Sequence, residues 1–329
     1  MPGVLVKVEG SQALPKKGRK VTVVGVGSVG MAVAYAIMVK ELATEIALVD
    51  IACERVKGEV MDLKHGKQFV RHCNVIGSTV SAGSDIVFVT AGARQQEGES
   101  RLNLVQKNVN IFKGMIPQIA RHSPCCILII VTNPVDILTS VAARLSGFPP
   151  NRVIGTGTML DSSRFRTMLG EVLGVSPSSV HALIIGEHGD SSVPVWSKVS
   201  VAGVPLSSLN PLVGKPNDPE NYGVIHKNVV DSAYQVIKLK GQTSWAIGLT
   251  CYALANAILN NAHTIYPLTT CVKGFYNIQD NVYLSLPVLV TANGAEYIVP
   301  LSLSPEEEAQ LRKSANALAE VTRTINWCS

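Results

Sequence analysis

A strand that runs directly into a glycine-rich turn and a helix constrains the fold of this chain more than any other feature. Residues 21–24 are β-branched, and Gly25, Gly27 and Gly30 follow with the spacing GxGxxG before a helix-like stretch at residues 31–40. In this motif the glycines allow a tight turn, a close approach of the backbone to a pyrophosphate, and close helix packing. The start of the helix also favours bound phosphate. The turn therefore predicts a dinucleotide site formed by Gly25, Val26, Gly27, Ser28, Val29 and Gly30.

An acidic residue at the end of the next strand indicates which dinucleotide is bound. Residues 45–50 form a second apolar strand that ends in Asp50. A carboxylate at this position can accept hydrogen bonds from ribose hydroxyls. It would repel a ribose phosphate, and the neighbouring Ile51 offers no positive charge to bind one. The sequence therefore predicts NAD rather than NADP. The alternative is a glycine-rich turn followed by an unrelated surface aspartate.

The pattern of elements predicts an α/β fold in two domains. Up to about residue 150, helical patterns alternate with buried apolar runs such as residues 85–90 and 126–131, which is typical of a doubly wound parallel sheet. Later patterns, at residues 193–206, 281–290 and 297–303, predict antiparallel strands. We therefore expect an N-terminal arm at residues 1–19, an NAD-binding Rossmann domain at residues 20–158, and an α+β substrate domain with antiparallel strands at residues 159–329.

Composition argues against several classes of function. Only 16% of the residues are charged and 47% are hydrophobic, as in a compact globular protein. The net charge of +5 is spread out, except for a basic cluster at residues 16–20 that lacks interleaved aromatic residues. A solvated terminal segment is favoured there over a nucleic-acid or localisation patch. We therefore expect no nucleic-acid partner. We also expect no membrane association, because the longest apolar helix is too short to span a bilayer. The seven cysteines show no paired or zinc-type spacing, which predicts reduced thiols, no metal and a cytoplasmic protein.

A histidine held between two glycines is the strongest candidate for catalysis. His188 follows the apolar run at residues 183–185 and is flanked by Gly186-Glu187 and Gly189-Asp190. Asp161 and Arg164 lie three residues apart and so share one face of a helix. Asp161 can orient and stabilise the imidazolium, and Arg164 can bind a carboxylate bidentately, through two parallel hydrogen bonds. The alternatives are an ordinary loop histidine and a capping aspartate with a surface ion pair.

Further polar residues follow the predicted strands, where ligands bind in such sheets. Residues 91–101 form a polar loop with two arginines, which is either a lid over the site or a solvated charged loop. Asn133 lies at the end of another strand and can donate and accept hydrogen bonds. The turn at residues 240–244 can place a hydroxyl group in the site.

Six ordered motifs resemble those of L-lactate dehydrogenases, within the lactate/malate dehydrogenase family. The resemblance extends from about residue 20 to the C-terminus. The motifs are VGVGSVG (24–30), AGARQQEGESR (91–101), TNPVD (132–136), LDSSRF (160–165), GEHGDS (186–191) and TSWAIG (243–248).

The resemblance implies an NAD-dependent oxidoreductase that transfers hydride reversibly between NADH and pyruvate, giving L-lactate. It makes His188 the acid/base group, paired with Asp161, and gives Arg101 on the closing loop the role of polarising the carbonyl. The implied substrate-binding residues are Arg101, Asn133, Arg164, Thr243 and Gln95. The implied cofactor-binding residues are Arg94, Asn133, Asp50 and the glycine-rich turn.

The prediction of which substrate is preferred depends on Gln95. Malate dehydrogenases, which are similar, have an arginine six residues before the loop arginine that pairs with the second carboxylate of oxaloacetate. The neutral Gln95 would leave that carboxylate without a counter-charge, so pyruvate is expected to be preferred. A malate dehydrogenase remains the alternative, as does a non-catalytic structural protein that retains the fold. The resemblance also implies a homotetramer, although residues 1–20 do not resemble the helical arm of animal relatives.

Overall fold

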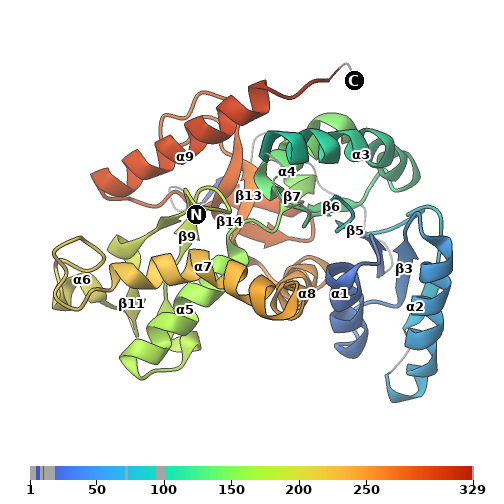
Figure 1. Ribbon diagram of the computed structural model, residues 1–329, viewed down its shortest axis with the longest axis horizontal. Coiled ribbons are helices and arrows are strands. Elements are labelled where there is room, and N and C mark those ends of the chain that lie inside the picture. The colour runs from blue at the N-terminus through green and yellow to red at the C-terminus, as the bar shows by residue number, and fades with distance from the viewer. Residues whose placement is uncertain (1–4, 8–9, 11–18, 71–72, 94–100, 328–329) are drawn as a thin grey trace.

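Strands from both halves of the chain join in one large sheet (Figure 1). The computed structural model describes residues 5–7, 10, 19–70, 73–93 and 101–327. The ten strands of the sheet have the order β1-β15-β14-β13-β7-β6-β5-β2-β3-β4. No helix within the described residues is long and apolar enough to cross a membrane.

The N-terminal half of the chain forms the parallel part of this sheet. Its order, β4-β3-β2-β5-β6-β7, is 3-2-1-4-5-6 along the chain, which is the arrangement of a dinucleotide-binding Rossmann fold. The order reverses between β2 and β5, so the crevice beyond their carboxyl ends is the expected ligand site. The strands are β2 (Lys20–Val24), β3 (Glu45–Val49), β4 (Asn74–Gly77), β5 (Ile86–Val89), β6 (Ile127–Ile130) and β7 (Val153–Gly155). The connecting helices are α1 (Ser28–Val39), α2 (Cys53–His65), α3 (Arg101–His122) and α4 (Val135–Ser146).

Antiparallel strands from the C-terminal half extend the same sheet. β13 joins it beside β7, where Thr269 pairs with Gly155. The added strands are β13 (Thr264–Cys271), β14 (Tyr283–Thr291) and β15 (Gly294–Ile298). The sequence patterns did not predict β13, and the predicted strand at residues 297–303 is wrong in its bounds. Gly294, with a φ of +94°, begins β15 directly after the turn, and Pro300 lacks the N–H that a longer ladder would need.

A short strand from the N-terminal arm completes the edge of the sheet. β1 (Val6–Lys7) runs antiparallel to β15, with Val6 opposite Ile298 and Lys7 opposite Tyr297. The described part of the arm therefore contacts the sheet at the end away from the glycine-rich turn.

The rest of the C-terminal half forms two small sheets and a group of helices. The predicted antiparallel strands near residues 193–206 are present but short. They and their neighbours are β8 (Val180–His181), β9 (Ile184–Ile185), β10 (Val193–Pro194), β11 (Ser200–Val201) and β12 (Val204–Pro205). The helices are α5 (Met159–Leu173), α6 (Leu206–Leu209), α7 (Gly223–Lys240), α8 (Trp245–Leu259) and α9 (Pro305–Arg323). Short 3₁₀ turns lie at Lys67–Phe69, Pro150–Arg152, Pro177–Ser179 and Trp196–Lys198.

Helix packing brings the two halves of the chain together. α1 packs against α8, and α4 contacts both α3 and α9 (Figure 1). α9 begins with a capping box, in which Ser304 accepts from the amide of Glu307 and the Glu307 side chain accepts from the amide of Ser304. These reciprocal bonds satisfy two amide groups at the start of the helix. The main hydrophobic core includes side chains from both halves, such as Phe112 and Leu286, so their relative position is fixed by buried apolar surface.

Candidate active site

The glycine-rich turn has the shape that a bound pyrophosphate requires. Gly25 has a φ of +104°, and a Cβ there would lie 2.5 Å from the amide nitrogen of Ala91. A Cβ at Gly30 would lie 1.8 Å from the carbonyl oxygen of Gly25. At Gly27, in contrast, a Cβ would meet no atom of the described residues within 4 Å. The turn is therefore packed closely on one side and open at Gly27, next to the start of α1, where amide groups can bind an anion.

Asp50 lies beside this turn, as the ribose site requires. Its Oδ2 accepts a hydrogen bond of 2.8 Å from the amide of Val26, and its Oδ1 accepts one of 3.0 Å from the amide of Ala52. The carboxylate is partly exposed, so its oxygens can accept further bonds from hydroxyl groups. Ile51 is fully exposed and provides no cation. These residues fit the pyrophosphate and ribose of NAD.

His188, Asp161 and Arg164 form one connected group, although they come from two separate segments. The Nδ1 of His188 lies 2.5 Å from Oδ2 of Asp161. The other carboxylate oxygen of Asp161 accepts a bond of 2.9 Å from a terminal nitrogen of Arg164. Asp161 lies in the first turn of α5, and His188 follows β9, so both side chains are fixed by regular elements. Since Nδ1 is engaged, Nε2 is the imidazole nitrogen that can exchange a proton with a substrate.

The electrostatic setting of this group favours a protonated histidine. Burial alone would lower the pKa of His188, but the charge and hydrogen bond of Asp161 outweigh it and raise that pKa to about 9. Burial would likewise raise the pKa of Asp161, but His188 and Arg164 hold it below its usual value. About a quarter (26%) of the histidine side chain remains exposed. The imidazolium is therefore both stabilised and accessible to a ligand.

Asn133 lies at the mouth of β6, where the sequence predicted it. Its Oδ1 accepts a bond of 3.3 Å from the amide of Val135, at the start of α4. The residue is exposed, and its side-chain amide can still donate to a ligand.

Thr243 lies half-buried in the loop before α8. The preceding residue, Gln242, accepts a bond of 2.5 Å from the hydroxyl of Ser28 in the glycine-rich turn. This contact places the predicted substrate loop next to the predicted coenzyme turn. The sequence did not indicate it, because no local pattern links residues so far apart.

The loop between β5 and α3 contains the remaining predicted residues. Arg94 and Gln95 lie outside the described residues, and Arg101 is the first residue of α3. Their predicted roles stay predictions. Among the described residues, no group of three or more His, Cys, Asp or Glu side chains is arranged to hold a metal ion.

One functional candidate was missed in the sequence. Asp136, in the motif Asn-Pro-Val-Asp, is only 3% exposed, and its Oδ2 accepts a bond of 2.7 Å from the amide of His188. A carboxylate in the first turn of a helix, directly after a strand mouth, was the available signal. The same pattern is also typical of an acidic residue that only stabilises the start of a helix, so the sequence alone cannot distinguish a structural role of Asp136 from a functional one.

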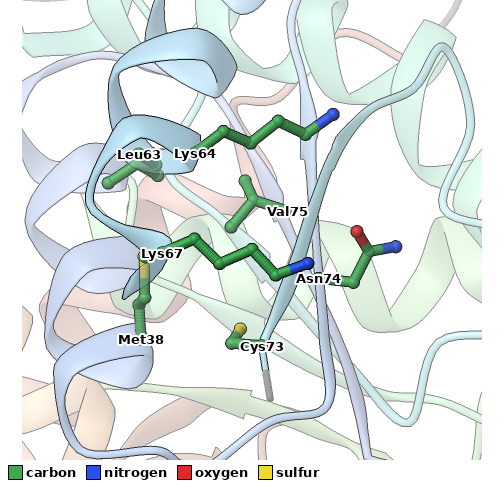
Figure 2. A pocket seen from close by; sticks show the side chains of 7 residues that line it. All are labelled: Met38, Leu63, Lys64, Lys67, Cys73, Asn74 and Val75. Carbon is green, nitrogen blue, oxygen red and sulfur yellow. The ribbon is translucent and has the colours of Figure 1, made fainter. Parts of the chain in front are cut away.

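A pocket of about 300 Å³ lies at the β4 edge of the parallel sheet, next to the amino end of this strand. Figure 2 shows its lining side chains, with Lys67 extending from beyond α2 toward Asn74 at the start of β4. Burial raises the pKa of the Cys73 thiol in this pocket, so it stays protonated. Because the glycine-rich turn follows the carboxyl end of β2, this pocket is not part of the candidate active site.

Known families and proteins are similar to this chain along most of its length. Residues 19–155 match the lactate/malate dehydrogenase NAD binding domain, and residues 158–326 match the lactate/malate dehydrogenase alpha/beta C-terminal domain. The chain is 56% identical, over 309 residues, to the L-lactate dehydrogenase A chains of Sphyraena idiastes, Danio rerio and Dissostichus mawsoni. Each alignment covers 93% of this chain and 93% of the relative.

Proposed function

This chain belongs to the lactate/malate dehydrogenase family, and we propose that it is an L-lactate dehydrogenase whose acid/base group is His188. It is an NAD-dependent oxidoreductase. The reaction is the reversible reduction of pyruvate by NADH to L-lactate. The observation that carries the proposal is the connected group of His188, Asp161 and Arg164, with contacts of 2.5 and 2.9 Å.

Each member of this group has a distinct role in the proposal. Arg164 binds the substrate carboxylate through guanidinium N–H groups other than the one that Asp161 accepts. The protonated Nε2 of His188 donates to the carbonyl oxygen and gives up its proton as the hydroxyl forms. Asp161 stabilises the imidazolium before transfer and keeps Nδ1 engaged throughout. In the reverse direction the neutral imidazole accepts the hydroxyl proton.

The coenzyme supplies or receives the hydride when it is bound. We assign its pyrophosphate to the glycine-rich turn and Arg94, and its adenosine ribose to Asp50. The corresponding division of the chain is an arm at residues 1–19, a coenzyme domain at residues 20–158 and a substrate domain at residues 159–329. The open side of the turn at Gly27 and the position of Asp50 support this assignment.

Four further residues complete the proposed substrate site. Asn133 contacts substrate and coenzyme, and Thr243 lines the pocket beside Gln242. Arg101 polarises the carbonyl as negative charge develops on it. We assign the choice of substrate to Gln95, because a neutral amide suits the methyl group of pyruvate better than a second carboxylate.

The preference for pyruvate is the direct test of this function. NADH oxidation by the purified protein, followed by absorbance, should give a much larger kcat/KM for pyruvate than for oxaloacetate. Gln95→Arg should shift the ratio toward oxaloacetate by at least about tenfold, because the new guanidinium provides the missing counter-charge. Gln95→Asn is the matched control and should keep the preference for pyruvate.

Three outcomes would count against parts of this proposal. Preference of the wild-type protein for oxaloacetate would make it a malate dehydrogenase. An unchanged ratio in Gln95→Arg would refute the role of Gln95. A folded protein that binds NADH but reduces neither acid would favour the non-catalytic structural role.

We also propose that the protein is a cytoplasmic homotetramer without nucleic-acid or membrane partners. Large apolar side chains are exposed on the outer faces of helices, including Tyr35 on α1, Trp245 and Leu249 on α8, and Leu239 on α7. Three of these four residues lie on α1 and α8, which pack against each other, and contiguous exposed apolar surface marks protein contacts. Sedimentation equilibrium should give about four times the mass of one chain. A monomer at assay concentration would contradict the proposal.

A further inference from the structure

The main chain around His188 is anchored to three separate elements. Three successive amides donate hydrogen bonds to groups outside their own segment, and each acceptor lies on a different element. They are Gly186 to the carbonyl oxygen of Ser285 on β14 (2.9 Å), Glu187 to the hydroxyl of Ser314 on α9 (2.9 Å), and His188 to Oδ2 of Asp136 on α4 (2.7 Å). Of these three acceptors only Asp136 carries a charge, so its hydrogen bond is charge-assisted and the other two are not.

Asp136 is itself held in place within the core. It is 3% exposed, and its Oδ1 accepts a bond of 2.5 Å from the hydroxyl of Thr269 on β13. It lies in the first turn of α4, where the helix dipole favours a negative charge. The two carboxylate oxygens thus connect the helix after Asn133, the antiparallel part of the sheet and the acid/base residue.

We propose that Asp136 is a positioning residue for His188, which fixes the main chain of the acid/base residue and adds a second buried negative charge that stabilises its imidazolium. His188 is then held by two aspartates from two helices, Asp161 at the side chain and Asp136 at the main chain. This role rests on the proposed function, because Asp136 acts only through His188.

The charges that face His188 give the expected direction of the effect. Asp161 and Asp136 raise the pKa of His188, and Arg164 on α5 lowers it. Glu187 precedes the histidine, and its carboxylate accepts a bond from Ser191. Burial raises the pKa of Asp136 to about 6, against the hydrogen bonds from Thr269 and His188. Above neutral pH the residue is therefore mainly a carboxylate, and its charge acts on the imidazolium through a poorly screened interior.

Asp136→Asn removes the charge of this residue and keeps a side chain of nearly the same shape. The asparagine carbonyl can accept from the His188 amide, and its NH₂ group can donate to the Thr269 hydroxyl, so both contacts can persist. The kcat/KM for pyruvate above neutral pH should fall by about tenfold, as expected when one charge-assisted hydrogen bond becomes a neutral one. Its decline at alkaline pH should move to lower pH, because the imidazolium loses a stabilising charge.

Ser314→Ala is the matched control. It removes the neighbouring main-chain anchor, at Glu187, but no charge. Its pH profile should match that of the wild-type protein even if turnover changes. Thermal denaturation and NADH fluorescence establish that each variant is folded and binds coenzyme. If Asp136→Asn is unstable, Thr269→Val provides a second route, because loss of the hydroxyl raises the pKa of Asp136 and should shift the profile in the same direction.

A measurement without turnover keeps this inference separate from the proposed function. Diethyl pyrocarbonate reacts with a histidine only when the imidazole is unprotonated. The pH dependence of its reaction at His188, followed by peptide mass spectrometry, therefore reports the pKa of this histidine. Faster modification of Asp136→Asn than of wild type at neutral pH supports the role, whether or not pyruvate is reduced. Equal modification profiles in folded proteins, or the same shift in Ser314→Ala, would overturn it. A wild-type protein inactive toward pyruvate would instead refute the proposed function.

Discussion

Replacing His188 with alanine is expected to lower kcat/KM for pyruvate by about two to four orders of magnitude, the usual contribution of a general acid/base group. The imidazolium is the proton donor in the proposed mechanism, so its loss leaves the proton transfer to water. Affinity for NADH should stay nearly unchanged, because the proposed coenzyme contacts lie around Gly27 and Asp50. Steady-state NADH oxidation and fluorescence titration with NADH measure the two quantities.

His181→Ala is the matched control for this experiment. His181 is an exposed residue of β8 in the same half of the chain, so its loss should leave turnover near the wild-type value. Turnover of His188→Ala close to the wild-type rate would refute the assigned role. Loss of NADH binding in folded His188→Ala would show that the coenzyme and acid/base sites are not separable as proposed.

Four of the six parallel strands, β2, β3, β5 and β6, were predicted because their signals are local, whereas the short strands β4 and β7 were not predicted. The glycine spacing, the buried runs and the acid at the end of β3 each lie within one strand–turn–helix unit, where backbone conformation and burial determine residue type. β13 was missed because it contains Pro267 and three threonines, so apolar periodicity is weak. Its burial depends on pairing with β7 and β14, which are distant in the sequence.

The candidate site was predictable in its residue types but only partly in its contacts. Glu187 and Asp190 flank His188 in the sequence, yet the carboxylate that binds its Nδ1 belongs to Asp161. That pairing was suggested by spacing along α5 and by family resemblance, not by proximity in the chain. Asp136 and the Ser28–Gln242 bond were missed, since both join segments that meet only when the sheet and helices have packed.

Asp161→Asn should have the second large effect, because this carboxylate holds both His188 and Arg164. Breaking a buried ion pair costs about 3–5 kcal/mol, and about 1.4 kcal/mol corresponds to tenfold, so kcat/KM for pyruvate should fall by about two to four orders of magnitude. KM should rise as well, because asparagine has one side-chain oxygen where the carboxylate has two, so it cannot accept from both Arg164 and the imidazolium, and the 2.9 Å contact with Arg164 is weakened. Steady-state kinetics with pyruvate separates the changes in kcat and KM. Asp190→Asn, which removes an exposed carboxylate two residues from His188, is the control and should change either value little.

The pH dependence distinguishes loss of charge at Asp161 from simple disorder. Asp161 raises the pKa of His188 to about 9, and burial acts in the opposite direction, so the variant histidine should lose its proton at much lower pH. Pyruvate reduction needs the imidazolium and should therefore decline at lower pH than in the wild-type protein. Lactate oxidation needs the neutral imidazole, so it should be impaired less near neutral pH. If both directions lose activity equally at every pH while the variant remains folded, Asp161 acts on geometry alone and its proposed electrostatic role is wrong.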